Sequence, residues 1–175
     1  MKNWLLFLGV MLFGMIGLGD NQSEAAGPVS WSQKLRCETS CSRFTVLRNW
    51  DNAAVLDKET GLVWEQSPDS APTYTWAEAQ DHCNNLQVSN RMGWRLPTLQ
   101  ELTSLIDTSQ ADPSLPSAHP FSNVANTFYW TATTYGPNTS FAWVLDLSDH
   151  SAFDGSKVSV LRAWCVRGGS GIDTQ

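Results

Sequence analysis

The four cysteines and three histidines are the residues whose side chains could perform catalysis or bind a metal ion. A zinc site needs closely paired ligands, but Cys37 and Cys41 do not form a Cys-x-x-Cys pair and the histidines are scattered. His82 directly precedes Cys83, but adjacent residues of a helix point about 100° apart, so a dyad is disfavoured and His82 is interpreted as solvated. The spacing therefore favours structural cysteines and predicts no zinc centre.

The N-terminus is typical of a secretory signal. Lys2 precedes an almost uninterrupted apolar run over residues 4–18, and small residues follow it. This run is too short for a stable membrane span. We therefore expect residues 1–26 to be a signal peptide, with an uncleaved anchor as the alternative. The mature protein would have no membrane span and would be exported to the periplasm, the outer surface or the extracellular medium.

Exported chains keep cysteines as disulfides, so four cysteines predict two bridges, for which three pairings exist. Cys37 and Cys41 are close neighbours, whereas Cys83 and Cys165 are far apart. The favoured pairing is therefore one small local loop and one long bridge. In the chain-entropy model a bridge of that length contributes about 4 to 5 kcal/mol. Residues 27–42 would form a leader held by the small loop.

The chain is acidic, with a formal net charge of -6 and only 11 lysines and arginines. No run of basic residues forms a stripe, which argues against nucleic acid as a partner. It argues against polyanions too, unless a few arginines converge in space. The nine tryptophans can serve either a hydrophobic core or a sugar-stacking surface.

Two capping boxes mark the predicted helices. Thr75 and Thr98 are each followed three residues later by a glutamate, so the side chain of each partner can satisfy the other's main-chain amide. An alternative is that Glu78 and Glu101 form a pair of carboxylates for general acid–base catalysis, but the helix-capping role is favoured. Apolar residues at helical spacing predict helices over residues 76–86 and 99–107.

Alternating apolar and polar residues predict the strands. The cleanest alternation places Phe141, Trp143, Leu145 and Leu147 on one core-facing side. Residues 108–127 contain three prolines and are predicted to have no regular structure, with Phe121 attaching them to the body. Strands are expected at residues 43–47, 54–56, 62–65, 128–134, 141–147, 157–160 and 161–167.

Two helices packed on a mainly antiparallel twisted sheet define an α+β domain. The domain would span residues 43–169, and a flexible tail, residues 170–175, would follow it.

Ordered motifs resemble one bacterial family. They are Thr60-Gly61-Leu62-Val63-Trp64, Trp76-x-x-Ala79-x-x-x-Cys83, Trp94-Arg95-Leu96-Pro97-Thr98-x-x-Glu101-Leu102, Tyr129-Trp130-Thr131-Ala132-Thr133, Ala142-Trp143 and Cys165-Val166-Arg167-Gly168-Gly169. Over residues 43–169 the chain resembles the Lcl C-terminal domain family, a bacterial domain of unknown function named for a collagen-like adhesin. The resemblance implies a C-type-lectin-like fold stapled by a Cys83–Cys165 disulfide, export, and a glycosaminoglycan ligand for the named adhesin.

The same motifs are similar to those of formylglycine-generating enzymes, which need a reactive cysteine pair that binds copper. By this resemblance Cys165 belongs to the structural bridge with Cys83, so no thiol pair remains for redox chemistry. No catalytic residue carries over from the family. The resemblance therefore implies a protein that is not an enzyme and has no cofactor.

Calcium-dependent sugar binding is the remaining metal hypothesis. Asp146, Asp149 and Asp154 surround one predicted hairpin, and carboxylates can hold Ca²⁺. A solvated hairpin rim is the favoured alternative, because acidic residues are common in turns. Trp50 lies in a predicted turn, where an exposed ring would stack on a sugar, but packing against a neighbouring loop is favoured.

The interpretation we favour is an exported, non-catalytic, lectin-like module that binds a glycan or an envelope protein. The alternatives are an assembly component of the envelope and a degenerate formylglycine-generating oxidase. The sequence predicts no particular oligomeric state. A sulfated glycan would need a salt-sensitive cluster drawn from Arg91, Arg95, Arg162 and Arg167. Salt-insensitive binding would instead indicate stacking on Trp50 or Tyr135 with hydrogen bonds from Asn138 and Asp149. Asp154 and Lys157 complete the predicted ligand residues.

Overall fold

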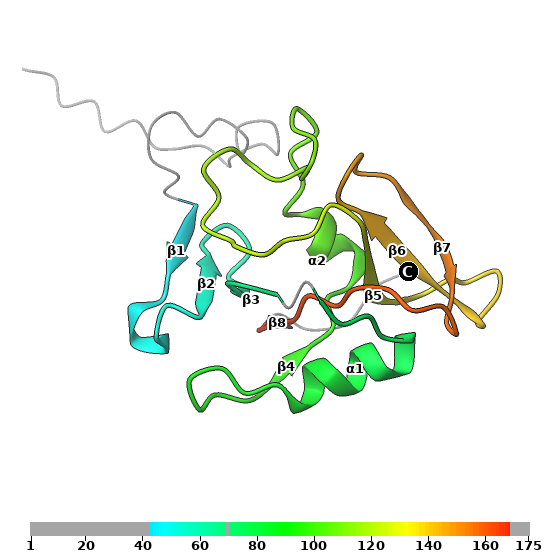
Figure 1. Cartoon of the computed structure of the whole chain (residues 1–175), viewed down its shortest axis with the longest axis horizontal. Coiled ribbons are helices and arrows are strands. Elements are labelled where there is room, and N and C mark those ends of the chain that lie inside the picture. Colours follow the sequence, from blue (N-terminus) through cyan, green and yellow to red (C-terminus); the bar gives the residue numbers. More distant parts are fainter. Residues whose placement is uncertain (1–42, 69–70, 169–175) are drawn as a thin grey trace, which may run out of the picture.

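The computed structural model describes residues 43–68 and 71–168 (Figure 1). The predicted signal peptide, the leader with Cys37 and Cys41, and the C-terminal tail lie outside the described residues. None of the helices in the described part is long and apolar enough to cross a membrane.

Two antiparallel sheets and two α-helices build the domain, which confirms the α+β prediction. One sheet has the strand order β1-β2-β3-β8-β4 and the other the order β5-β6-β7. Figure 1 shows β1 and β2 at one end of the molecule and the three-stranded sheet at the other. The elements are β1 (Phe44–Val46), the 3-10 turn η2 (Arg48–Trp50), β2 (Ala54–Asp57), β3 (Val63–Glu65), α1 (Trp76–Asn85), β4 (Trp94–Arg95), α2 (Leu99–Thr103), β5 (Phe128–Thr134), β6 (Phe141–Asp146), β7 (Ala152–Ser156) and β8 (Val166–Arg167).

Both predicted capping boxes are present. The Glu78 carboxylate accepts the amide of Thr75 at 2.8 Å, and the Glu101 carboxylate accepts that of Thr98 at 2.9 Å. In each box the threonine hydroxyl accepts the glutamate amide in return. Each helix therefore begins where its own side chains satisfy the first free amides.

The second helix is shorter than predicted. It ends at Thr103, and the chain continues in tighter turns in which Leu105 and Ile106 donate to carbonyls three residues earlier. Residues 108–127 have no helix or strand, as predicted, and Phe121 is buried against Phe44 and Trp164. The long segment is therefore attached to the core through Phe121, as expected, and also through the buried Leu115.

The last hairpin differs from the prediction. The prediction of a strand at residues 157–160 is wrong. The strand β7 lies earlier, at Ala152–Ser156, and a turn follows it. The β6–β7 turn closes early because Asp146 accepts the amide of Ser148 and Asp149 accepts that of Ser151. The expected strand over residues 161–167 is also reduced, to β8 at Val166–Arg167.

The predicted core face of β6 is half wrong. Leu145 is buried, but Phe141 and Trp143 are only partly buried, whereas Ala142 and Val144 are completely buried. The reason is that both faces of the three-stranded sheet pack into core. Tyr129, Leu145 and Leu147 join one hydrophobic cluster, and Trp130, Ala142 and Val144 join the other.

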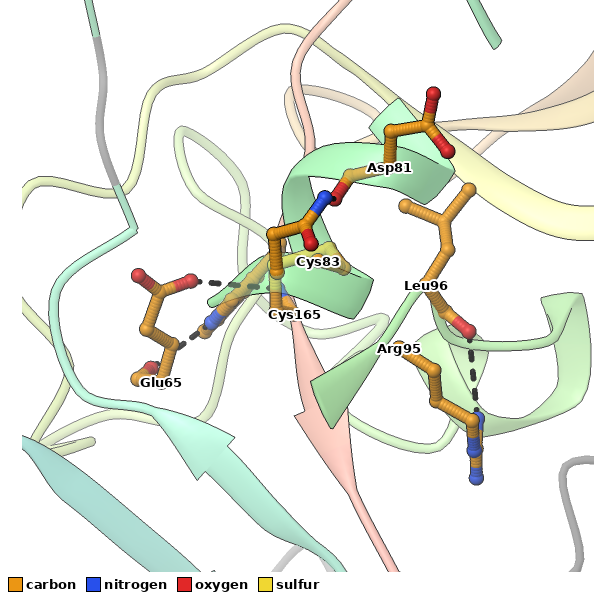
Figure 2. The surroundings of a disulfide bond; sticks show 8 residues. Glu65, Asp81, Cys83, Arg95, Leu96 and Cys165 are labelled. Carbon is orange, nitrogen blue, oxygen red and sulfur yellow. Dashed lines mark hydrogen bonds between the residues drawn. A yellow bond between two sulfur atoms is a disulfide. The ribbon is translucent and has the colours of Figure 1, made fainter. Parts of the chain in front are cut away.

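One disulfide joins Cys83 of α1 to Cys165, which directly precedes β8. Their Cα atoms are 5.4 Å apart across a separation of 82 residues. Beside it the Glu65 carboxylate accepts the amide of Cys165 at 3.4 Å (Figure 2). The bridge expected from the family resemblance therefore fastens the first helix to the central strands of the five-stranded sheet.

Candidate ligand-binding surface

Trp50 is buried, which agrees with the favoured interpretation that it packs against its neighbours and contradicts the alternative of an exposed sugar-stacking ring. Its side chain closes the turn η2 with 8% of its surface exposed. The indole meets that of Trp94 edge-to-face, with centroids 6.1 Å apart and planes at 85°. Trp50 belongs to the same hydrophobic cluster as Ala54 and Trp94, and burial of its large apolar ring keeps it in place.

Two arginines cover Trp50. The guanidinium carbon of Arg91 lies 4.5 Å from the ring centroid, and that of Arg167 lies 5.2 Å from it. We call Trp50, Arg91 and Arg167 the arginine–tryptophan stack. Cation–π attraction holds both cations at the ring. Across residues 43–68 and 71–168, neither guanidinium lies within 4.0 Å of a carboxylate oxygen, and Arg91 donates only to the carbonyl of Ser89.

The strand register places Arg167 and Trp94 on the same face of the five-stranded sheet. One cross-strand row runs through all five strands, and directly paired residues share a face. The row consists of Thr45, Leu56, Val63, Arg167 and Trp94. Thr45 is exposed, Leu56, Val63 and Arg167 are partly buried, and Trp94 is buried. The tryptophan of the stack is therefore shielded, and its two partly buried arginines are the members that solvent can reach.

The other two predicted arginines do not join the stack. Arg95 forms a bidentate ion pair with Glu101, with both N–O distances 2.7 Å, and donates to the carbonyl of Gly168. Burial opposes ionisation of Glu101, but hydrogen bonds from Arg95 and Thr98 outweigh it and lower the pKa of the carboxyl. Arg162 donates to the carbonyl of Pro72. Of the four predicted arginines, the structure brings together Arg91 and Arg167.

A second group of predicted ligand residues lies at the outer end of the β5–β6 hairpin. Tyr135 and Asn138 form the turn, and the Tyr135 ring packs edge-to-face on Trp143 with centroids 5.2 Å apart. Asp154 of β7 is the direct cross-strand partner of Trp143. The sequence pattern placed Trp143 in the core, because Trp143 alternates with Phe141 and Leu145 on a side that was expected to face inward.

Lys157 lies at the same end of the sheet, but its ammonium group already interacts with Trp76 and Thr134. Its ammonium group is 3.8 Å from the centroid of Trp76 and donates to the hydroxyl of Thr134 at 3.0 Å. Desolvation lowers the pKa of Lys157. Trp76 in turn donates its indole N–H to the carbonyl of Thr131. Lys157 therefore ties the end of β7 to the start of α1.

The three aspartates proposed for calcium do not converge. Asp146 accepts two hydrogen bonds from Ser148 and faces the opposite side of the sheet from Asp154. Asp149 lies in the turn at the far end of β6 from Tyr135, and the hydroxyl and amide of Ser151 lower its carboxyl pKa. Within the described part of the chain, His, Cys, Asp and Glu nowhere form a group of three suited to a metal ion.

The histidines occupy separate environments. His82 is partly buried and stacks on Tyr74 with centroids 4.6 Å apart, so it is not the solvated residue predicted. It lines an open hollow of about 620 Å³ together with Glu78 and Leu86. His119 stacks on Phe121, and burial lowers its pKa. His150 is exposed in the β6–β7 turn.

No curated protein matches the chain. Residues 53–167, more than half of the chain, match the family described as the Lcl C-terminal domain, and this chain belongs to that family.

Proposed function

We propose that this protein is an exported, non-catalytic binding module of the bacterial cell envelope, and that it binds an anionic glycan at the arginine–tryptophan stack. Membership of the Lcl C-terminal domain family supports a binding role, because the resemblance implies a glycosaminoglycan ligand for the adhesin that gives the family its name.

The observation that carries the proposal is the pairing of two guanidinium groups on one indole without a carboxylate partner in the described chain. Both guanidinium groups lie near one ring centroid, so a sulfate or carboxylate bound at the stack would gain two cationic partners. Guanidinium groups present planar pairs of donors that match both anions. Two such partly exposed groups at one tryptophan form a local cationic site on an acidic protein.

The test is binding of heparin to the purified exported protein by calorimetry over a series of salt concentrations. Binding should weaken as salt rises, because the ion pairs are screened. The variant with Arg91→Gln and Arg167→Gln should bind about tenfold more weakly or worse. Lys58→Gln is a charge control, since it removes one positive charge from an exposed turn that is not part of the stack.

Equal weakening by Lys58→Gln would show that only overall charge matters, and would contradict the site. No response to heparin or other glycans from a folded protein would favour the alternative function, an assembly component that binds a protein. One observation supports that alternative: Phe128 and Phe153 are exposed and pack edge-to-face with centroids 5.2 Å apart.

A further inference from the structure

Tyr135 and Trp143, the hairpin aromatic pair, leave hydrogen-bonding groups unused at a partly exposed position. Their ring planes meet at 79°, so the two rings form a corner on one face of the β5–β6–β7 sheet. Four other indoles, those of Trp76, Trp94, Trp130 and Trp164, donate to main-chain carbonyls. Within the described ranges, the indole N–H of Trp143 and the hydroxyl of Tyr135 donate to no acceptor.

Two polar side chains flank the corner. Asp154 lies directly opposite Trp143 on the same face, where paired Cβ atoms are about 5 Å apart. Asp154 is exposed, and its carboxylate makes no hydrogen bond or ion pair with any other described residue. Asn138 uses its amide oxygen to accept from Ser140 at 3.1 Å, which leaves its amide NH₂ pointing to no described acceptor.

The chemistry of these groups selects among ligands. The indole, phenol and amide are donors, whereas the carboxylate only accepts. An anion would be repelled by Asp154, and an ammonium group would offer nothing to the three donors. A hydroxyl group both donates and accepts, so it matches the whole set. The flat apolar area of the indole then favours a ring with an apolar CH face over an open-chain polyol.

We propose that the hairpin aromatic pair, with Asp154 and Asn138, is a binding site for an uncharged pyranose, which stacks on Trp143 and donates hydroxyl hydrogens to Asp154. The site extends the proposed glycan-binding function to a neutral saccharide and shares no residue with the arginine–tryptophan stack. It also does not use Trp50 or Asp149, which the sequence had placed among the ligand residues.

The experiment is a titration of the ¹⁵N-labelled exported protein with cellotetraose and with tetra-N-acetylchitotetraose. The indole N–H resonance of Trp143, assigned by its loss in Trp143→Phe, should shift with at least one of these probes. The shift should persist near 1 M salt, where the Debye length is about 3 Å, because no ion pair is involved. Trp143→Ala and Asp154→Asn should each weaken binding about tenfold.

The matched control is Phe153→Ala. Phe153 is the neighbour of Asp154 on β7, but it faces the other side of the sheet with 37% of its surface exposed. This variant and the variant with Arg91→Gln and Arg167→Gln should bind the neutral probe as the parent protein does. Retained binding in both, with loss in Trp143→Ala, supports the site.

Two results would overturn the inference: a Trp143 resonance that shifts with neither neutral probe, or equal weakening of binding by Phe153→Ala. Heparin binding distinguishes this failure from that of the proposed function. If heparin binds and the neutral probes do not, only the hairpin site is wrong. If the neutral probes bind and heparin does not, only the anionic site is wrong.

Discussion

Arg43 and Asp57 form a buried bidentate ion pair between the residue that precedes β1 and the last residue of β2. The Nε–Oδ1 distance is 3.0 Å and the Nη2–Oδ2 distance is 2.7 Å, and the side chains are 5% and 0% exposed. Arg43 also donates to the carbonyl of Ser104 at 2.8 Å. The pair therefore connects the edge of the five-stranded sheet to the end of α2.

Replacement of Asp57 by alanine should lower the free energy of unfolding by about 3 kcal/mol, because it removes the buried carboxylate that pairs with Arg43 and leaves that cation only the more exposed Glu59, 3.1 Å from its Nε. Urea unfolding followed by tryptophan fluorescence measures the change. Lys58→Ala, at the exposed next position, should change stability by less than about 0.5 kcal/mol. A small effect of Asp57→Ala would mean that water reaches Arg43 in the folded state.

The same pair makes stability depend on pH. Burial opposes ionisation of Asp57, but hydrogen bonds and the charge of Arg43, with help from Thr60 and the Glu59 amide, outweigh it and lower the pKa of the carboxyl. Its stabilisation is therefore complete above the unfolded carboxyl pKa of about 3.9 and is lost as the pH falls through the lower folded value. Asp57→Asn should flatten the acid limb of a plot of stability against pH.

His119 should produce a second pH dependence, at higher pH. Burial lowers the pKa of its imidazole, with a smaller opposing contribution from the main chain of Phe121. The unfolded chain then binds the proton more tightly, so the stabilisation is complete above about pH 6.5 and is lost as the pH falls through the folded pKa. His119→Gln should remove this step, measured by urea unfolding at a series of pH values. Persistence of the step in that variant would assign it to another group.

Gly155 leaves no space for a side chain. A Cβ atom there would lie 2.6 Å from Cγ2 of Val144 and 3.1 Å from the ring of Trp130, both completely buried. Gly155→Ala should therefore cost about 1 to 3 kcal/mol by overpacking, measured by thermal unfolding. Ser156→Ala, at the next position of β7, is the control and should be nearly neutral. Equal stability of Gly155→Ala and the parent protein would show that β7 can move away from β6.

The Cys83–Cys165 bridge closes most of the domain into one loop. Replacement of both residues by serine should lower the free energy of unfolding by about 4 to 5 kcal/mol in the chain-entropy model. Denaturant unfolding measures the loss, and peptide mapping of unreduced protein should recover the two cysteines in one linked pair. A linkage of either cysteine to Cys37 or Cys41 would contradict the structure.

Local signals in the sequence predicted the local features well. The boxes Thr75–Glu78 and Thr98–Glu101 act between residues three positions apart, so the sequence contains all that they need. The strand at Phe128–Thr134 and the irregular segment at 108–127 were likewise predicted at their observed positions. Trp50 was listed among the ligand residues but is buried, and Trp143 was expected in the core but is only partly buried, because burial depends on what packs against each residue.

The amino-acid order by itself therefore determined the family, the helix starts, the α+β class and the favoured cysteine pairing. Only the tertiary structure decided which side chains of β6 are buried and which are partly exposed, because residues on both faces of this strand join hydrophobic clusters. It alone brought Arg91 and Arg167 onto Trp50, and Asp154 beside Trp143, because contacts between distant segments depend on strand register and packing. Both candidate binding sites are made of such contacts.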